Sequence, residues 1–595
     1  MPDSTNEIPK KSLEDWIAPD CHGMNFFEAD KGLQDLLSLR LDDAVRAHMT
    51  PHYQRLGEIA GNRLDELSRM ADRHDPQLHA RDSFGRDEDW IEFHPAYREM
   101  EALGYGEFGI HCMSRKAGVL GWAEKVPPLV KYTFQYLFTQ SEFALMCPIS
   151  ATDTSAMLIE RYGDEETKQR FLPRMWSQDM THIFKGAQFM TEKTGGSDVG
   201  NIELEARQDE NDQWRLYGEK WFCSCADGDV ALLLARPAGA PDGSRGLGLF
   251  ALPRHLDDGS RNAYRIVRLK EKLGSRSMAS GEIKFDGAVA YALGDYGAKP
   301  NSGLKQMMDQ VNMSRLSHGV RAAGMMRRCL NEAMAVARNR VAFGETIIDH
   351  PLMRRQLLKI MVPTEQVLSV FTYAAATMAR AETGDAQAER LLRIITPLLK
   401  FRACRDNVTV ATAAMEARGG NGYIEDWVNS KLVRDAHLGV LWEGTSSINA
   451  LDVTGRAVGK VGAHEDLGNA MHDIVDAADQ VPGQFRGELS SMVDQAIAFA
   501  ADVASKPEHE PFSRQATNAL YHVMSAVLLA HEGAALGAKG GDARRLLLSR
   551  LVIDHRMRPR DPMSVSDGPV ETRCADLLLN DAPVSLDAAA QALAG

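Results

Sequence analysis

Apolar and polar positions follow different rhythms in different parts of the chain. Up to about residue 182, apolar residues recur at helical spacing, most clearly over 126–149 and 154–163. Between about 183 and 297 the rhythm changes to short alternating segments, separated by turn-forming runs such as DENDQ and AGAPDGSRG. We predict about seven strands there, in a small antiparallel barrel or sandwich. Helical periodicity returns from about residue 302 and continues toward the C-terminus.

This order of segments predicts an α+β fold that is mostly α, divided into four domains. The expected units are an N-terminal helical domain (1–182), a central β domain (183–297), a C-terminal helical bundle (298–454) and an additional helical domain (455–595). A Lys-Pro break at 506–507 interrupts the last unit. Because strands and helices do not alternate, the order argues against a Rossmann fold.

Charge and cysteine usage narrow the function classes. The net charge is −14, and such a chain is on average repelled by phosphate backbones, which disfavours nucleic-acid binding. The eight cysteines are scattered, and the close pair Cys223 and Cys225 lacks zinc spacing, so we expect no metal site. The N-terminal segment has no apolar signal core and no apolar run is long enough to span a membrane. We therefore expect a cytoplasmic protein without membrane contact.

A glycine-rich segment, GAQFMTEKTGGSDVG at 186–200, is the first candidate for chemistry. Gly195 and Gly196 allow close approach of the backbone to a ligand, and Thr191 and Ser197 place hydroxyls on either side. Backbone N–H groups of such a loop are natural phosphate donors. Taken alone, the segment is more typical of a plain hairpin loop.

The segment YGEKWFCSCADGD at 217–229 is the second candidate. An aromatic pair followed by Ser224 could form a platform and a hydroxyl donor for a planar ring. The alternative is a strand with one buried aromatic side chain.

The third candidate is the segment 415–453, which contains GGNGY, then RDA, then WEGT. This succession resembles the acyl-CoA dehydrogenase superfamily, in which GG-x-G-aromatic, RDA and aromatic-EGT follow at the same intervals. Three earlier segments resemble further motifs of that family in the same order: MTEKTGGSD (190–198), GEKWFCS (218–224) and RNRVAFG (338–344). Arg315 also lies at the family's distance ahead of Arg340. The resemblance implies the fold of that family, with a four-helix bundle after the β domain.

The resemblance implies FAD-dependent α,β-dehydrogenation of an acyl-CoA thioester, with hydride passing to flavin N5. The match to aromatic-EGT makes Glu443 the base that removes the α-proton. Beside Trp442 and an apolar acyl pocket, desolvation would raise the pKa of this carboxyl. Some relatives carry the base one residue before the equivalent of Arg315, where this chain has Ser314, which cannot serve. Without the resemblance, Glu443 would be interpreted as a solvated carboxylate at a helix N-terminus.

The same resemblance assigns the contacts of cofactor and substrate. Contacts with FAD are expected from Met190, Thr191, Gly196, Ser197, Phe222, Cys223, Ser224, Trp442, Thr445 and Ser447. The adenosine half of an FAD held by a neighbouring subunit is expected to contact Arg340, Phe343, Glu416, Gly419 and Gly420. Ser197, Asn312 and Arg315 are expected to contact the substrate, and Arg315 also to fix the electrostatics beside the base. The shared site implies a homo-oligomer, either dimer or tetramer, and the family implies electron-transfer flavoprotein as electron acceptor.

Other features resemble one branch of the family, the AidB type of alkylation-resistance protein. These are the MTEK form of the loop, WIEFHPAYREM (90–100), GSRSMAS (274–280) and the long C-terminal extension. Two alternative functions follow: a DNA-associated protective flavoprotein, and an acyl-CoA oxidase that uses oxygen. Residues 451–595 hold 13 Lys and Arg against 20 Asp and Glu, which is the opposite of a DNA-binding footprint. The one basic run, 543–560, is interpreted as the solvated side of a helix.

Overall fold

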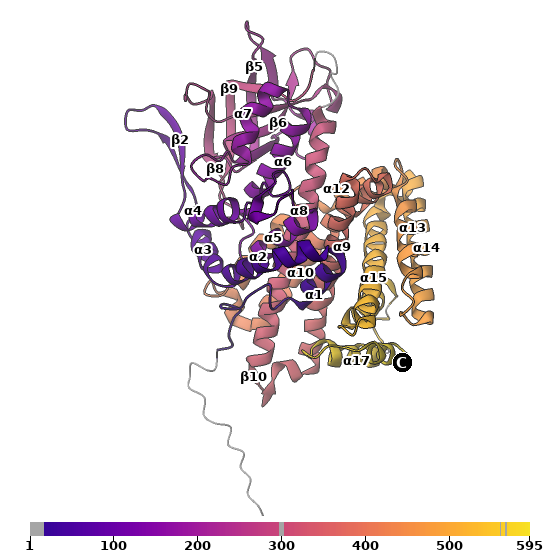
Figure 1. Ribbon diagram of the computed structural model, residues 1–595. Coiled ribbons are helices and arrows are strands. Elements are labelled where there is room, and N and C mark those ends of the chain that lie inside the picture. Colours follow the sequence, from indigo (N-terminus) through magenta and orange to yellow (C-terminus); the bar gives the residue numbers. More distant parts are fainter. Residues whose placement is uncertain (1–16, 297–302, 560, 566–567, 595) are drawn as a thin grey trace, which may run out of the picture.

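The computed structural model describes residues 17–296, 303–559, 561–565 and 568–594. A β domain sits at one end of a helical body, and the helices of the C-terminal region form a further layer along the side of that body (Figure 1). The expectation of a mostly helical fold with a β-rich central domain is confirmed.

Helices fill most of the N-terminal region, where apolar residues recur every three to four positions. Asp30, Asp42 and Asp164 each begin a helix by accepting a backbone N–H bond two or three residues further on. Helices α5 and α6 are buried along almost their whole length and form part of the core. The helices are α1 (Lys31–Arg40), α2 (Asp43–Gly61), α3 (Arg63–Asp72), α4 (Pro95–Glu101), α5 (Pro128–Thr139), α6 (Met146–Tyr162) and α7 (Glu165–Met175).

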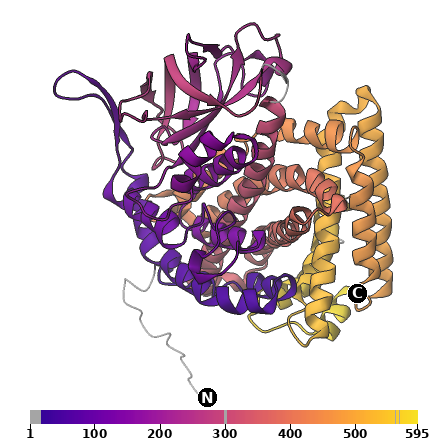
Figure 2. The ribbon, with the colours of Figure 1, turned by 45° about the horizontal axis from the view of Figure 1, so that its top comes forward.

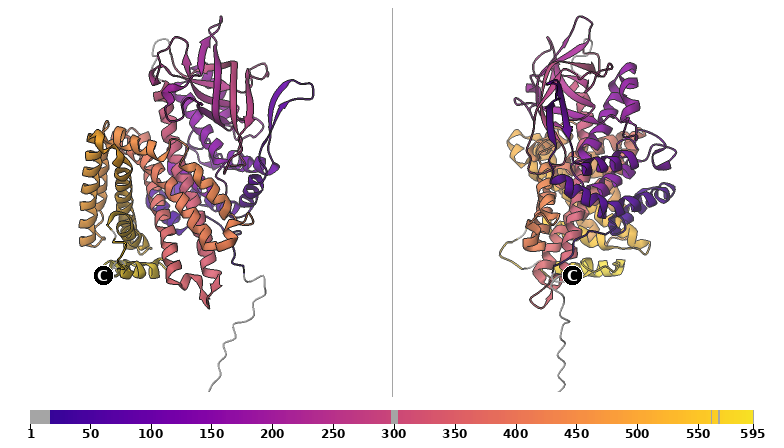
Figure 3. Two further views of the ribbon diagram at one scale, coloured as in Figure 1. Left: turned by 180° about the vertical axis from the view of Figure 1, so that it is seen from behind. Right: turned by 90° about the vertical axis from the view of Figure 1, so that its left-hand side faces the viewer.

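A β-hairpin interrupts this helical region, where the sequence pattern predicted helix only. Strand β1 (Gln77–Arg81) pairs with β2 (Asp87–Glu92). The carboxylate of Asp82 accepts hydrogen bonds from the backbone N–H groups of Phe84 and Arg86. These side-chain to backbone bonds take donors that a helix would use, and they close the turn. The hairpin projects from the body on the side opposite the C-terminal layer (Figure 3).

The β domain forms where the alternating segments predicted it. Its seven strands join into one sheet in the order β3-β5-β4-β6-β7-β9-β8, and extra pairings of β3 with β6 and of β5 with β9 curl that sheet toward a barrel. The strands are β3 (Gly186–Thr191), β4 (Glu205–Gln208), β5 (Trp214–Ser224), β6 (Val230–Pro237), β7 (Gly248–Pro253), β8 (Tyr264–Leu269) and β9 (Ser280–Ala292).

The pairing is not purely antiparallel, which corrects one detail of the prediction. Both β3 and β4 run parallel to β6 and antiparallel to β5. β3 pairs with the first half of β6, and β4 pairs with its end, so the two short strands lie in line. The glycine-rich loop therefore connects two strands, β3 and β4, that lie end to end along β6. Both ends of the loop join the sheet at neighbouring positions.

Three long helices, α8, α9 and α10, build the bundle below the β domain (Figure 1). They run alternately up and down, so the end of α8, the start of α9 and the end of α10 meet at the end of the bundle remote from the β domain. The elements are α8 (Gly303–Asn339), the hairpin β10 (Val341–Ala342) and β11 (Glu345–Thr346), α9 (Pro351–Glu382), α10 (Ala386–Arg418), α11 (Asn429–Gly439) and α12 (Ser446–Leu451).

The C-terminal layer packs along one side of the bundle (Figure 2). Its longest helix, α15 (Ser513–Ala538), follows the predicted Lys-Pro break, which a short 3₁₀ helix occupies. The stretch Pro507–Ala538 is long and apolar enough to cross a membrane, and 83% of its most apolar window is buried inside the structure. The other helices are α13 (Ala463–Asp476), α14 (Gly483–Ser505), α16 (Arg544–Val552), α17 (Gly568–Leu578) and α18 (Leu586–Leu593).

A buried ionic cluster joins this layer to the rest of the chain. Arg545 of α16 donates to Glu365 of α9 at 2.7 Å and to Glu532 of α15 at 2.9 Å. Glu365 also pairs with Arg327 of α8, and Arg327 lies 3.0 Å from Asp30 at the start of α1. All five side chains are buried or nearly so. Removing one member would therefore leave its partners charged and desolvated.

We predict that Arg545→Met lowers the free energy of unfolding by about 3–5 kcal/mol, because Glu365 and Glu532 lose their shared partner. Urea unfolding monitored by circular dichroism measures the change. Arg390→Met is the matched control, since Arg390 also bridges the bundle and the C-terminal layer through Asp466 but is exposed, and it should cost no more than about 1 kcal/mol. Equal effects of the two substitutions would contradict the prediction.

Candidate functional site

A cavity of about 840 Å³ lies between the β domain and the helical bundle. The glycine-rich loop, strand β5, helices α6 and α8, and the turn between α11 and α12 all contribute to its wall. Segments far apart in the sequence therefore meet here. The predicted site residues that line it are Met190, Thr191, Gly196, Ser197, Phe222, Ser224, Arg315, Trp442 and Glu443.

The turn that carries Glu443 is an unusual piece of backbone. Glu443 has φ +53° and Gly444 has φ +91°, so two consecutive residues adopt the left-handed region. For a glutamate this conformation is strained and persists only when the surroundings hold it. Lys400 and Asn449 both donate to the Gly444 carbonyl, the second at 2.7 Å, and Arg315 donates to the Glu443 carbonyl at 3.2 Å.

A hydrogen bond from Ser314 holds the Glu443 carboxylate at the cavity wall. Ser314 donates its hydroxyl to Oε1 at 2.8 Å. Burial raises the pKa of Glu443, while this hydrogen bond and the positive charges of Arg315, Lys400 and Arg321 oppose the rise. The result is a carboxyl group that is partly desolvated yet able to ionise, which are the properties of a general base.

Arg315 serves the turn and does not reach out into the cavity as an unpaired charge. Its Nη1 donates to Asp452 at 2.8 Å, and Arg393 clamps the same carboxylate with bonds of 2.7 and 3.1 Å. With its Nε on the Glu443 carbonyl, Arg315 links α8 to the strained turn. Besides the electrostatic role predicted for it, Arg315 therefore has a structural role, which is to hold the turn that carries Glu443.

Glu192 explains the shape of the glycine-rich loop. Its buried carboxylate accepts from Lys220 at 2.6 Å and from the backbone N–H of Glu203 at 2.6 Å. The bond to Lys220 anchors the loop to β5, and the bond to Glu203 joins the beginning of the loop to its end. The backbone closes tightly inside this clamp, because a Cβ on Gly195 would lie 2.4 Å from the carbonyl oxygen of Asp198.

Strand β5 presents alternate residues to the cavity. Phe222 and Ser224 line it, while Cys223 points the other way and is fully buried in the β domain. Of the predicted FAD contacts, Cys223 therefore has only its backbone near the cavity. The Phe222 ring is 52% exposed despite its place at the cavity, so an apolar surface is left for a planar group to cover.

These residues fit FAD, the cofactor that the family resemblance implies. Hydroxyls of Thr191, Ser197 and Ser224 border the cavity beside the exposed Phe222 ring. A Cβ on Gly196 would meet only the Thr191 methyl at 3.6 Å, so there is open space in front of the loop backbone. Such a loop offers backbone donors to a pyrophosphate, and the ring offers a stacking surface.

Eight further predicted residues do not line this cavity. Asn312 lies on α8 beside lining residues, and Thr445 and Ser447 are exposed at the start of α12. The other five gather at the remote end of the bundle, where α8 and α10 end, and Phe343 there is 98% exposed. Within one chain these five cannot reach the cavity. They are Arg340, Phe343, Glu416, Gly419 and Gly420.

Sequence reasoning missed four polar residues of the site. His318 and Arg321 follow Ser314 at four and seven positions along α8, which is one face of a helix, and both line the cavity. That spacing was the signal that could have found them. Cys147 also lines the cavity, and Lys400 supports the Glu443 turn from α10.

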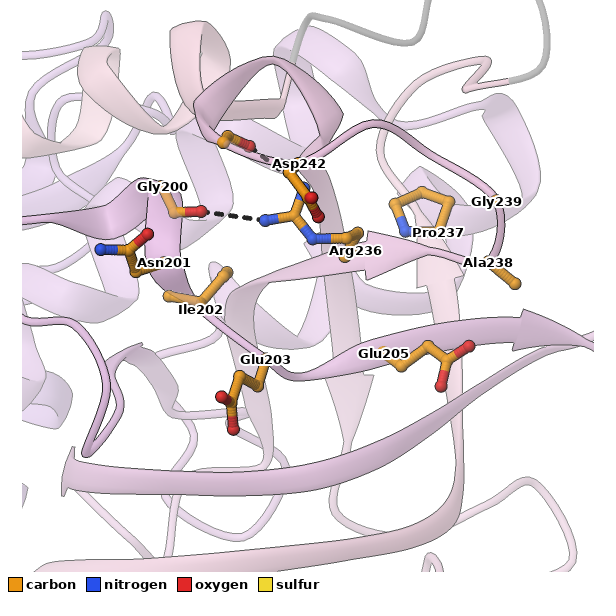
Figure 4. A pocket seen from close by; sticks show the side chains of 11 residues that line it. Gly200, Asn201, Ile202, Glu203, Glu205, Arg236, Pro237, Ala238, Gly239 and Asp242 are labelled. Carbon is orange, nitrogen blue, oxygen red and sulfur yellow. Dashed lines mark hydrogen bonds between the residues drawn. The ribbon is translucent and has the colours of Figure 1, made fainter.

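A second, smaller cavity of about 480 Å³ shares the lining residues Gly200, Asn201 and Gly243 with the first. Arg236 of β6 lines it and donates to the carbonyls of Gly200 and Gly243 (Figure 4). Both hydrogen bonds tie the far end of the glycine-rich loop to β6. The smaller cavity thus lies beside the contacts that support the loop.

Comparison with known proteins agrees with this geometry. Three family models match successive parts of the chain: the adaptive response protein AidB N-terminal domain at 17–180, and the acyl-CoA dehydrogenase middle and C-terminal domains at 187–288 and 301–458. The chain is 32% identical to acyl-CoA dehydrogenase family member 11 of Caenorhabditis elegans, over 72% of this chain and 70% of that protein. It is 33% identical to the putative acyl-CoA dehydrogenase AidB of Escherichia coli K12, over 77% and 80%.

The chain belongs to the acyl-CoA dehydrogenase family. The match of its N-terminal region confirms the predicted resemblance to the AidB branch, and the family is one of oxidoreductases that act on acyl-CoA. Among solved structures, Caenorhabditis elegans ACDH-11 in complex with C11-CoA superposes with a TM-score of 0.83 at 26% identity, covering 94% of this chain and 95% of that one. The structure of Bd2924 in its apo form superposes with a TM-score of 0.76 at 28% identity, covering 87% of this chain and 99% of that one. Such coverage includes much of the C-terminal layer.

The clamp around the loop leads to a test on two neighbouring glycines. Gly195→Ala should lower the free energy of unfolding by about 1–3 kcal/mol, because its Cβ would collide with the Asp198 carbonyl. Gly196→Ala should change it by less than about 0.5 kcal/mol, since only an ordinary contact forms. Urea unfolding without added FAD compares the two, and a larger loss in Gly196→Ala would contradict the described loop.

Proposed function

We propose that this protein is an FAD-dependent acyl-CoA dehydrogenase in which Glu443 is the catalytic base. The observation that carries the proposal is a desolvated carboxylate on one wall of a cavity, facing a cofactor-sized space bordered by Phe222 and Ser224. Acyl-CoA as the substrate is supported by the complex of the structural relative ACDH-11 with C11-CoA.

The residues divide the work of α,β-dehydrogenation. The carboxylate of Glu443 takes the α-proton of the thioester and becomes a neutral carboxylic acid. Bound FAD would accept the β-hydrogen together with two electrons, leaving an α,β-double bond in the acyl chain. Ser314 holds the carboxylate oxygen through the proton transfer, and Arg315, Lys400 and Asn449 keep the turn from relaxing out of reach.

The remote end of the bundle supports an oligomer in this proposal. Large apolar side chains gather in exposed positions there: Val341, Phe343, Leu352, Tyr423 and Ile424. In a monomer this apolar surface stays exposed to water, whereas a subunit interface would bury it. The five predicted adenosine contacts of this end would then serve the FAD of a neighbouring subunit. Electron-transfer flavoprotein as acceptor and a cytoplasmic location complete the proposal.

The alternative of a DNA-associated protein finds little support in the charges of the C-terminal layer. The basic run 543–560 was its best candidate, yet the arginines of this run that the structure describes are engaged with carboxylates. Arg545 is buried in the ionic cluster, and Arg550 and Arg558 both pair with Asp554. Neutralised arginines make a poor surface for a phosphate backbone.

Glu443→Gln should abolish catalysis and leave the fold intact. The amide oxygen can still accept the Ser314 hydrogen bond, but it cannot take a proton, so we expect flavin reduction to slow by about 10²–10⁴-fold. The measurement is anaerobic bleaching of bound flavin by a panel of short, medium, long and aryl acyl-CoAs. Exposed Glu389→Gln is the control and should match wild type. If no thioester bleaches wild type the reaction is wrongly assigned, and if no FAD binds the cofactor contacts are wrong.

Ser314→Ala should move the acid limb of the pH profile. The base must be ionised, so activity is lost as the pH falls through the pKa of Glu443. Removing a hydrogen bond that favours the carboxylate raises that pKa further, so the limb should shift to higher pH by roughly half to one unit. The pH dependence of kcat/KM measures it, with Ser314→Thr as a control that keeps the hydroxyl. A shift to lower pH would refute the assigned role.

A further inference from the structure

A buried arginine with unused donors closes part of the cavity. Arg321 of α8 is 1% exposed and lines the cavity wall. Its Nε and Nη1 have no hydrogen-bond partner among the described residues. No carboxylate of the described chain lies within ion-pair distance of it, unlike Arg315, Arg327 and Arg328 on the same helix. Buried guanidinium groups are ordinarily paired, so this one calls for a ligand.

Its neighbours hold the guanidinium in place without neutralising it. The rings of Phe143 and Trp442 lie 5.5 and 5.9 Å from its central carbon. Nη2 of Arg321 lies 2.8 Å from Nδ1 and 3.1 Å from Nε2 of the His318 imidazole, and Nδ1 lies 2.8 Å from the Ser314 carbonyl oxygen. Burial and the arginine's charge lower the pKa of His318, which keeps the imidazole neutral. The thiol of Cys147 lies alongside, and burial raises its pKa.

The other charged groups of the cavity leave Arg321 without a counter-charge. Arg315 shares Asp452 with Arg393, and the buried Lys400 donates to the backbone carbonyl of Gly444. Glu443 is the carboxylate of the catalytic turn, and it accepts from a serine and not from Arg321. The carboxylates that line the cavity, Asp198, Glu443 and Asp452, equal its arginines in number, yet none of the three lies within ion-pair distance of Arg321. A ligand that brought a negative charge would compensate Arg321.

Position along α8 sets how far this charge lies from the reacting carbons. Ser314 marks the α-carbon because it holds the base, and Arg321 is seven residues further, about 10 Å along the helix axis. A helical side chain leans back toward the N-terminus, which shortens the gap. An acyl chain of roughly four to seven carbons would bring its distal end to the guanidinium.

We propose that Arg321 binds an anionic group at the distal end of the acyl chain, so that the preferred substrates are ω-carboxyacyl-CoA thioesters. This inference rests on the proposed function, because it requires the acyl chain to enter the cavity beside Glu443. An apolar chain of the same length would leave the Nε and Nη1 donors desolvated and unpaired. A site with buried polar donors discriminates strongly against ligands that cannot satisfy them.

The test is a comparison of matched acyl-CoA pairs by isothermal titration calorimetry on the FAD-loaded protein. Glutaryl-CoA is compared with pentanoyl-CoA, and adipoyl-CoA with hexanoyl-CoA. We expect wild type to bind the dicarboxylic member of at least one pair more than about 10-fold tighter. Arg321→Met should remove or invert this preference, and Arg321→Lys should keep part of it. Arg338→Met, an exposed arginine at the end of the same helix, should leave the ratio unchanged.

The outcomes separate this inference from the proposed function. If the apolar thioesters bind equally or better in wild type while some acyl-CoA still bleaches the flavin, the inference is overturned and the dehydrogenase assignment stands. If no acyl-CoA binds or bleaches the flavin, the assignment itself falls. A preference that persists in Arg321→Met would also overturn the role of Arg321. Should Arg321→Met fail to fold, the wild-type ratio and Arg321→Lys still decide.

Discussion

The left-handed turn at Glu443 and Gly444 is the constraint on which the rest of the site depends. It places a carboxylate in the cavity, and such a turn is strained for glutamate unless other elements hold it. Three helices do so: Arg315 reaches it from α8, Lys400 from α10 and Asn449 from α12. The bundle therefore acts as a frame for one peptide segment. Mutations that loosen the packing of the bundle should displace the Glu443 carboxylate before they unfold the chain.

The parts of the fold that local chemistry determines could be predicted from the sequence. All seven alternating segments of the β domain became strands, because turn-forming runs separate them and their alternation suits a half-buried sheet. The hairpin at 77–92 was missed because its strands are short and highly charged, with Trp90 half exposed. The in-line arrangement of β3 and β4 was also beyond reach, since it depends on pairing with β5 and β6, which are remote in sequence.

The site shows the same division between local motif and long-range packing. Motif residues such as Thr191, Phe222 and Glu443 meet at one cavity, although they come from three separate segments. Arg321 was not foreseen, because a charged residue on an amphipathic helix is ordinarily on its solvated face. Its burial arises only when α6 and the turn after α11 pack over α8. Tertiary packing thus converts an ordinary helical arginine into a feature of the site.

Two buried arginine environments on α8 show how this protein uses charge. In the C-terminal half of the helix, Arg327 pairs with Asp30 and Glu365 and Arg328 pairs with Asp65, and these pairs join the N-terminal region to the bundle. Two turns earlier, Arg321 meets rings, a neutral imidazole and a thiol instead. An ion pair completed within the chain contributes to holding the fold together, whereas a buried charge left incomplete costs stability until something binds. Retaining such a cost at a cavity wall is what a binding site requires, because the missing partner is then supplied by the ligand.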